Sequence, residues 1–134
     1  MSYEMIWEKR GVYRRYYGHS SDLEVSESVN LTHSSDKFDE LRYVILDFLD
    51  VTAFEVTSHA FIQETSALDA AAAHSNPNIK IAVVAADPEI TTLAKEYIAN
   101  ELTPYPTRIY SNMADARNWV SVCLPPQGRS RKIM

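Results

Sequence analysis

The sequence predicts an α/β fold: a mixed β-sheet with parallel strands at its centre, helices packed on the sheet, and the order ββαβαβαβα. Two apolar runs, residues 43–48 and 79–86, support this prediction, because β-branched runs without polar alternation are typical of strands covered on both faces. Asp47 and Asp87 lie at the ends of these runs, and a helix-start signal follows each. This strand–turn–helix order indicates βαβ units, whose strand-end loops usually carry the site of an open α/β sheet.

The composition predicts one domain, residues 1–126, followed by a mobile tail, residues 127–134. The chain has 134 residues, of which 46% are hydrophobic, enough for a core. Its formal net charge of −5 disfavours binding to nucleic acid, since counterion release favours basic proteins. Cys123 is the one cysteine, and neither a signal peptide nor a membrane-spanning run is recognisable. These features predict a cytoplasmic protein without membrane insertion.

The chain opens with two predicted strands, residues 4–8 and 11–17, which form an antiparallel hairpin around Gly11. Gly18 is expected to end the second strand. Ser21 begins a capping box with a glutamate three residues on, and it predicts a surface helix that ends near residue 33. The basic residues of the hairpin, which we interpret as outward-facing charges that discourage edge-to-edge pairing, are Lys9, Arg10, Arg14 and Arg15.

The middle of the chain contains a predicted buried strand over residues 42–48. Thr52 and Glu55 form a second capping box, which predicts a helix from residue 52 to about residue 74. Phe54 and Phe61 lie seven residues apart in this segment, the spacing of two side chains on one apolar stripe.

The second half begins after an Asn-Pro-Asn break at residues 76–78, with the second apolar run as its strand. Asp87 and the proline that follows it predict the start of the next helix. Residues 108–110 are expected to form a short strand at a sheet edge. Ser111 or Asn112 caps a last helix, which a proline pair ends.

The sequence lacks the common catalytic and cofactor-binding patterns. It has 3 glycines, and none follows a predicted parallel strand, so a phosphate-binding glycine loop is not expected. The 4 histidines show no zinc-binding spacing, and no nucleophile lies on a glycine-bearing elbow. We therefore predict a non-enzymatic protein with no catalytic residue, metal or cofactor. An enzyme that uses Asp47, Asp50 and Asp87 to hold Mg²⁺ remains a weaker alternative.

Hydroxyl groups gather where the chain leaves the first buried strand. Thr52, Thr57 and Ser58 all lie near the predicted start of the second helix. A phosphate added at a helix amino terminus meets unpaired amides and the positive end of the dipole, so this group is a candidate switch. The alternative is structural, with Thr52 as a helix cap and the other two as small residues. The Glu55 carboxylate would repel a phosphate.

Four segments between residues 4 and 122 form a recognisable pattern: the hairpin with Trp7 and Tyr16-Tyr17-Gly18, the strands 43–47 and 80–84, and Arg108-Ile-Tyr-Ser111 before Trp119-Val120. Together they resemble the SpoIIAA-like family of small bacterial proteins, relatives of the STAS domains. The resemblance implies a mixed sheet with helices packed along it and a role in protein–protein regulation.

The resemblance also implies a regulatory position. In anti-sigma-factor antagonists of this family, a partner kinase phosphorylates a serine in an Asp-Ser-Ser-Gly stretch, and that breaks a complex. Glu55-Val56-Thr57-Ser58 is the similar stretch here, and Thr57 matches the phosphorylated position. The stretch departs from the pattern, because glutamate replaces aspartate, valine replaces the first serine and the glycine is missing.

We therefore expect a STAS-like regulatory or protein-interaction module with an unidentified protein partner. The alternative is a carrier or sensor of a small apolar or anionic, lipid-like ligand that lies near the strand ends against Phe54 and Phe61. Aromatic residues of the hairpin, Trp7, Tyr13 and Tyr16, leave a homodimer open. The candidate regulatory or partner-binding residues are Asp50, Thr52, Glu55, Thr57, Ser58 and Asp87.

Overall fold

The computed structural model describes residues 3–122, so Cys123, the proline pair and the predicted tail lie outside the described residues. Its elements follow the predicted order ββαβαβαβα, with one short 3₁₀ turn added before the third strand. They are β1 (Tyr3–Trp7), β2 (Gly11–Ser21), α1 (Asp22–Ser34), η1 (Phe38–Glu40), β3 (Tyr43–Glu55), α2 (Phe61–Ala72), β4 (Lys80–Val84), α3 (Pro88–Ala99), β5 (Thr107–Tyr110) and α4 (Met113–Ser121).

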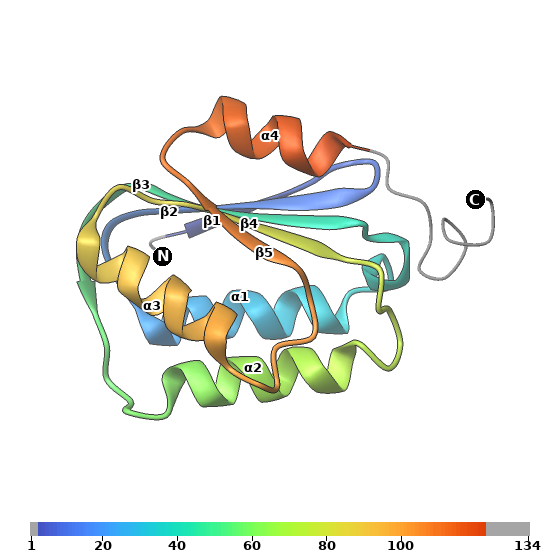
Figure 1. Ribbon diagram of the computed structural model, residues 1–134, viewed down its shortest axis with the longest axis horizontal. Helices are drawn as coiled ribbons and strands as arrows, with labels where there is room; N and C mark the ends of the chain where they lie inside the picture. Colours follow the sequence, from blue (N-terminus) through green and yellow to red (C-terminus); the bar gives the residue numbers. More distant parts are fainter. Residues whose placement is uncertain (1–2, 123–134) are drawn as a thin grey trace.

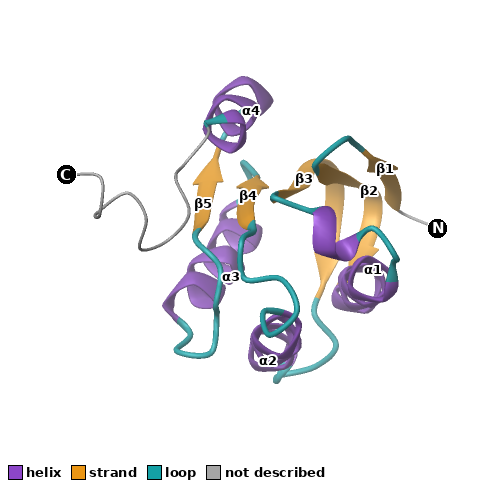
Figure 2. Cartoon of the chain, turned by 90° about the vertical axis from the view of Figure 1, so that its right-hand side faces the viewer, coloured by secondary structure: helices purple, strands orange, loops and turns teal. Residues whose placement is uncertain are grey.

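The strands form one 5-stranded sheet in the order β1-β2-β3-β4-β5. β1 pairs with β2 in the antiparallel direction, and the other neighbouring strands pair in parallel. Helices α1, α2 and α3 lie on one face of the sheet, and α4 lies on the other (Figures 1 and 2). We call these two sides the three-helix face and the α4 face.

The prediction from the two apolar runs is confirmed. They form β3 and β4, which lie side by side in parallel register, with Val44 opposite Ile81. Most of their side chains are buried, as expected for strands with helices on both sides of the sheet. The predicted edge strand at 108–110 is β5, the last strand of the sheet.

Several predicted helix starts are also confirmed. The Ser21 backbone N–H donates to the Glu24 carboxylate at 3.1 Å, which is half of a capping box. Asp87 accepts a hydrogen bond from the Glu89 N–H at 3.1 Å at the start of α3. Asn112, and not the serine before it, caps α4.

The predicted helix over residues 52–74 is wrong in its first part. β3 continues to Glu55, and α2 begins only at Phe61. Residues 51–55 instead pair with the far end of β2, where Phe54 lies opposite Ser20. Thr52 is therefore an exposed strand residue and caps no helix. Backbone pairing with a long neighbouring strand outweighs the capping signal, since β-branched and aromatic residues suit a strand as well.

Gly18 does not end the second strand, which was the prediction. β2 runs on to Ser21, and Gly18 adopts a φ of +64°, a conformation that glycine reaches at no steric cost. The register between β2 and β3 shifts on both sides of it, between Arg15 and Tyr17 and between Gly18 and His19. The glycine thus lies between two irregularities of the ladder, at each of which β3 carries an extra residue opposite β2, as in a β-bulge.

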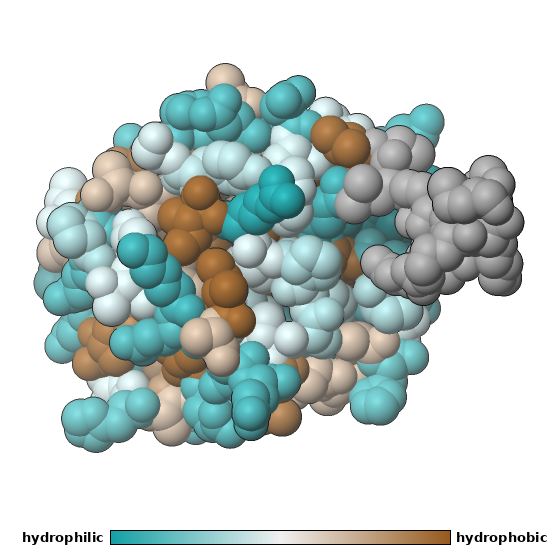
Figure 3. All heavy atoms as spheres, viewed as in Figure 1, coloured by the Kyte–Doolittle hydropathy of each residue, from teal (hydrophilic) through white to brown (hydrophobic). Residues whose placement is uncertain are grey.

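The main core lies on the three-helix face, and a smaller cluster lies beneath α4. Tyr16 is fully buried in the main core and stacks on Phe48 with ring centroids 4.6 Å apart. It therefore lies inside the monomer and offers no exposed surface for a dimer. On the face shown in Figure 3, hydrophobic side chains form small groups separated by hydrophilic ones. Among residues 3–122, no helix has the length and apolar character that crossing a membrane requires.

Candidate functional site

A buried carboxylate holds the loop that joins β3 to α2, residues 56–60. Asp22 is the first residue of α1, and its exposed fraction is 2%. Its Oδ1 accepts hydrogen bonds from the Thr57 N–H at 3.1 Å and the Thr57 hydroxyl at 2.9 Å. Its Oδ2 accepts one from the Ser58 N–H at 3.1 Å. We call this arrangement the Asp22 clamp.

The clamp fixes an exposed loop in one conformation. A carboxylate at the amino terminus of a helix is stabilised by the helix dipole, and charge-assisted hydrogen bonds are the stronger kind. Around the clamp, Glu55, Val56, Thr57 and His59 are exposed residues. Loops held on rigid elements commonly carry recognition residues. The clamp can therefore present these side chains to a partner without a large ordering cost.

The structure does not bring every candidate residue to this loop. Asp50 pairs with Arg15 at 2.9 Å, and Asp87 caps α3. Asp47 accepts hydrogen bonds from the Tyr13 hydroxyl at 2.5 Å and the Leu49 N–H at 3.0 Å. The three aspartates considered for Mg²⁺ are thus each held by a different local partner. Among residues 3–122, no group of three His, Cys, Asp or Glu side chains is arranged to hold a metal ion.

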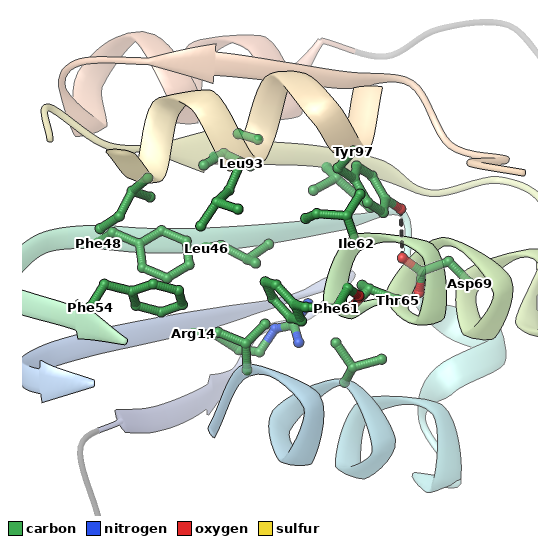
Figure 4. A pocket seen from close by; sticks show the side chains of 16 residues that line it. Arg14, Leu46, Phe48, Phe54, Phe61, Ile62, Thr65, Asp69, Leu93 and Tyr97 are labelled. Carbon is green, nitrogen blue, oxygen red and sulfur yellow. Dashed lines mark hydrogen bonds between the residues drawn. The ribbon is translucent and has the colours of Figure 1, made fainter. Parts of the chain in front are cut away.

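A second feature lies beneath the loop, between the sheet and the helices of the three-helix face. It is an apolar cavity of about 80 Å³ (Figure 4). Phe54 from the end of β3 and Phe61 from the start of α2 both line it. Figure 4 shows the Phe54 ring beside Phe48 and the Phe61 ring farther along the cavity, with Leu93 of α3 on the opposite wall. The two phenylalanines proposed as ligand-lining residues thus meet at one cavity, although they belong to different elements.

Two buried charges interrupt the apolar lining. Arg14 has an exposed fraction of 4% and Asp69 one of 7%. Asp69 accepts hydrogen bonds from the Tyr97 hydroxyl at 2.5 Å and from His33 Nε2 at 2.9 Å. Burial, together with the Asp69 charge, raises the pKa of Tyr97 well above its usual range. The phenol therefore stays protonated and remains a donor to the carboxylate.

Arg14 is poorly satisfied by comparison. Its Nη1 donates to the Ser28 hydroxyl at 3.2 Å, and its buried Nε has no hydrogen-bond partner among residues 3–122. Within the same residues, no carboxylate forms an ion pair with it. Interpreting Arg14 as an outward-facing charge was therefore wrong. The sequence signal for its burial is the alternation of side chains along β2. Val12 and Tyr16, two residues before and after Arg14, share its face of the strand and point to the core.

No protein-family model matches the chain, and no curated protein sequence matches it. Solved structures do match. The anti-sigma factor antagonist SpoIIAA in its unphosphorylated form has a TM-score of 0.60 and 9% identity, over 90% of this chain and 99% of that chain. The Bacillus cell fate determinant SpoIIAA in its phosphorylated form has a TM-score of 0.57 and 11% identity, over 88% and 98%.

A third solved structure is an uncharacterized protein of the DUF3478 family with a SpoIIAA-like fold, from Shewanella loihica. It has a TM-score of 0.51 and 12% identity, and the match covers 88% of this chain and 91% of that chain. Identities this low bear on the fold alone. The mixed sheet, the order of elements and these likenesses lead to one conclusion: the chain has a SpoIIAA-like fold.

Proposed function

We propose that this protein is a non-enzymatic regulatory module that binds a protein partner in the cytoplasm. Its contact surface is the end of β3 together with the loop 56–60. The observation that carries the proposal is the Asp22 clamp, which ties an exposed loop to the buried start of α1 through hydrogen bonds. Support also comes from the fold, since one solved protein that shares it is an anti-sigma factor antagonist.

Thr57 is the position at which this contact is regulated. Its hydroxyl donates to the buried Asp22 carboxylate at 2.9 Å, yet the residue is exposed enough to meet a modifying enzyme. A phosphate on this oxygen removes the donor and places a second negative charge beside Asp22. Like charges at this distance repel, so modification opens the clamp and changes the shape of the loop. One of the matching SpoIIAA structures is itself in a phosphorylated form.

The test uses the purified chain as bait in cross-linking experiments with a native lysate. We expect the wild-type chain to capture a protein partner that Thr57→Glu fails to capture. Thr92→Glu is the matched control, because Thr92 is an exposed threonine whose hydroxyl bonds to its own helix, α3. It should retain the partner. Equal capture by both variants, or no partner that depends on residue 57, contradicts the proposal.

The cavity favours a second candidate function, the binding of a small ligand. Its lining is apolar apart from a few polar groups, which is the usual composition of a small-molecule site. A carrier or sensor should bind small organic molecules that raise its melting temperature, and native mass spectrometry should detect them. A flat melting profile across apolar and anionic compounds contradicts this candidate.

A further inference from the structure

We infer that the cavity on the three-helix face binds a small monocarboxylate with a short apolar body, and that Arg14 holds its carboxylate. This inference rests on the second candidate function and names its ligand class. The apolar body lies among Phe48, Phe54 and Phe61, the rings that Figure 4 shows between the sheet and the helices.

Arg14 carries a buried positive charge that the described residues leave unpaired. It lines the cavity, its exposed fraction is 4%, and its hydrogen bond to Ser28 satisfies only one nitrogen. The buried Nε has no partner among residues 3–122. Burying a charge is costly unless the charge is paired and hydrogen-bonded. A guanidinium group offers parallel N–H donors that match the two oxygens of a carboxylate, so an anionic ligand relieves this cost directly.

Asp69 does not fill this role, although it lines the same cavity. Its two oxygens accept from Tyr97 and His33, and it forms no ion pair with Arg14. Its charge also limits what can enter. A phosphate dianion would be repelled more strongly than a carboxylate, which carries a single negative charge. The pair of buried charges therefore favours a monoanion whose charged end lies toward Arg14 and away from Asp69.

The volume sets the size of the apolar body. The cavity holds about 80 Å³, far more than one water needs. It is about half the 150 Å³ of an engineered cavity that accepts benzene, so the body should have roughly three to five carbons. Its walls are aliphatic and aromatic side chains of the sheet, α1, α2 and α3. Such walls reward burial of an alkyl chain, because each buried methylene contributes about 0.8 kcal/mol.

The test measures binding of sodium pentanoate, 1-pentanol and inorganic phosphate to the full chain by calorimetry and by amide chemical shifts. We expect pentanoate to bind about tenfold or more tightly than pentanol, since it gains charge-assisted hydrogen bonds, and phosphate not to bind. A series from acetate to octanoate should have its optimum near pentanoate. Equal affinity for pentanoate and pentanol overturns the inference, and so does absence of pentanoate binding.

Two variants assign the binding to the site. Arg14→Met should reduce pentanoate affinity to about that of pentanol. Arg15→Met is the matched control, because Arg15 is the next residue of β2 and lies on the other face of the sheet, paired with Asp50. It should bind pentanoate as the wild type does. Unchanged pentanoate binding in Arg14→Met overturns the inference.

A further variant protects the test against a failure of Arg14→Met to fold. Ala94 lines the cavity from α3, so Ala94→Leu should fill the cavity and abolish binding of both compounds while Arg14 stays in place. Pentanoate binding that survives this filling overturns the inference. If the wild-type chain binds pentanol and pentanoate equally well, the inference about Arg14 fails but the second candidate function stands. If no compound binds, both fail, whereas the proposal for the loop is tested separately by the Thr57 variants.

Discussion

Two adjacent arginines of β2 have opposite surroundings. Arg14 points into the three-helix face, where it has one hydrogen bond and no ion pair within residues 3–122. Arg15 lies on the α4 face, where it pairs with Asp50 at 2.9 Å and with Glu4 at 3.5 Å. Since neighbouring strand residues face opposite sides, one step along the chain separates a buried charge from a solvated one. The comparison shows that charge alone does not reveal what a basic residue does.

The α4 face continues this pattern of satisfied charges. Arg117 of α4 forms a bidentate ion pair with Glu8. Its Nη1 donates to Glu8 Oε1 at 2.7 Å, and its Nη2 donates to Glu8 Oε2 at 2.8 Å. The Tyr43 hydroxyl also donates to Glu8. On this face Arg15 and Glu8 each have more than one partner, whereas on the three-helix face Arg14 and Asp69 line an apolar cavity. The first arrangement is typical of a stable surface and the second of a binding site.

The largest effect that we expect comes from Asp69→Ala. The variant leaves the buried Tyr97 hydroxyl and the His33 ring without their acceptor. The free energy of unfolding should fall by about 3 kcal/mol, as expected when buried partners of a charged group are left unpaired. Urea denaturation measures it, with Asp36→Ala, at an exposed carboxylate, as the control. A loss no larger than that of the control would contradict this interpretation of the three-helix face.

The second effect should have the opposite sign. Arg14→Met replaces a poorly satisfied buried charge with an apolar side chain, and Ser28 keeps its hydrogen bonds to Tyr16 and Val25. We expect the free energy of unfolding of the ligand-free chain to rise by about 1–2 kcal/mol. Arg15→Met should lower it slightly. If chemical denaturation ranks the two variants the other way, the contrast between the arginines is wrong.

The third prediction concerns pH and the α4 face. Hydrogen bonds from Arg117 lower the pKa of Glu8 below its usual value. A carboxyl with a lowered pKa in the folded state stabilises the fold above the unfolded-state pKa and loses this contribution as the pH falls through the folded-state value. Glu8→Gln should therefore be less stable than the wild type by about 1 kcal/mol at pH 7 and by clearly less at a pH below the folded-state pKa. An equal difference at both pH values would refute this.

The smallest effect should come from Asp50→Asn. Asp50 and Arg15 form an exposed pair, and solvent and salt screen such pairs strongly. The melting temperature should change little at low salt and not at all at high salt. A large fall in melting temperature that persists in high salt would show that the α4 face depends on this pair, contrary to the contrast drawn between the two arginines.

The regular parts of the fold could be predicted from sequence because they depend on local signals. Apolar runs identified β3 and β4, and caps such as Asp87 marked helix starts. Residues 51–55 were misassigned because their partner, the far end of β2, lies more than thirty positions away in sequence. Long-range pairing outweighed a local capping pattern there.

The candidate site was accessible only in part. The sequence pattern indicates Thr57 and Ser58, but Asp22, which holds both, lies in a different element, and only the folded structure brings it to them. Arg14 was assigned to the surface because basic residues cluster around it in sequence. Its burial depends on which face of β2 the helices cover, and composition carries no information on that point.

β3 is longer than β4, its neighbour on one side, and this difference affects how the sheet can open locally. β3 pairs with β4 only over Tyr43–Asp47, so residues 51–55 are bonded within residues 3–122 to β2 alone. This projecting two-stranded arm can fray without disturbing the sheet beneath it, since local opening costs less than global unfolding. Asp22 fastens its outer end. Loss of the hydrogen bonds to Asp22 should let the arm move as far back as Gly18 and no further. Amide exchange would then accelerate in the arm, while the central strands stay protected.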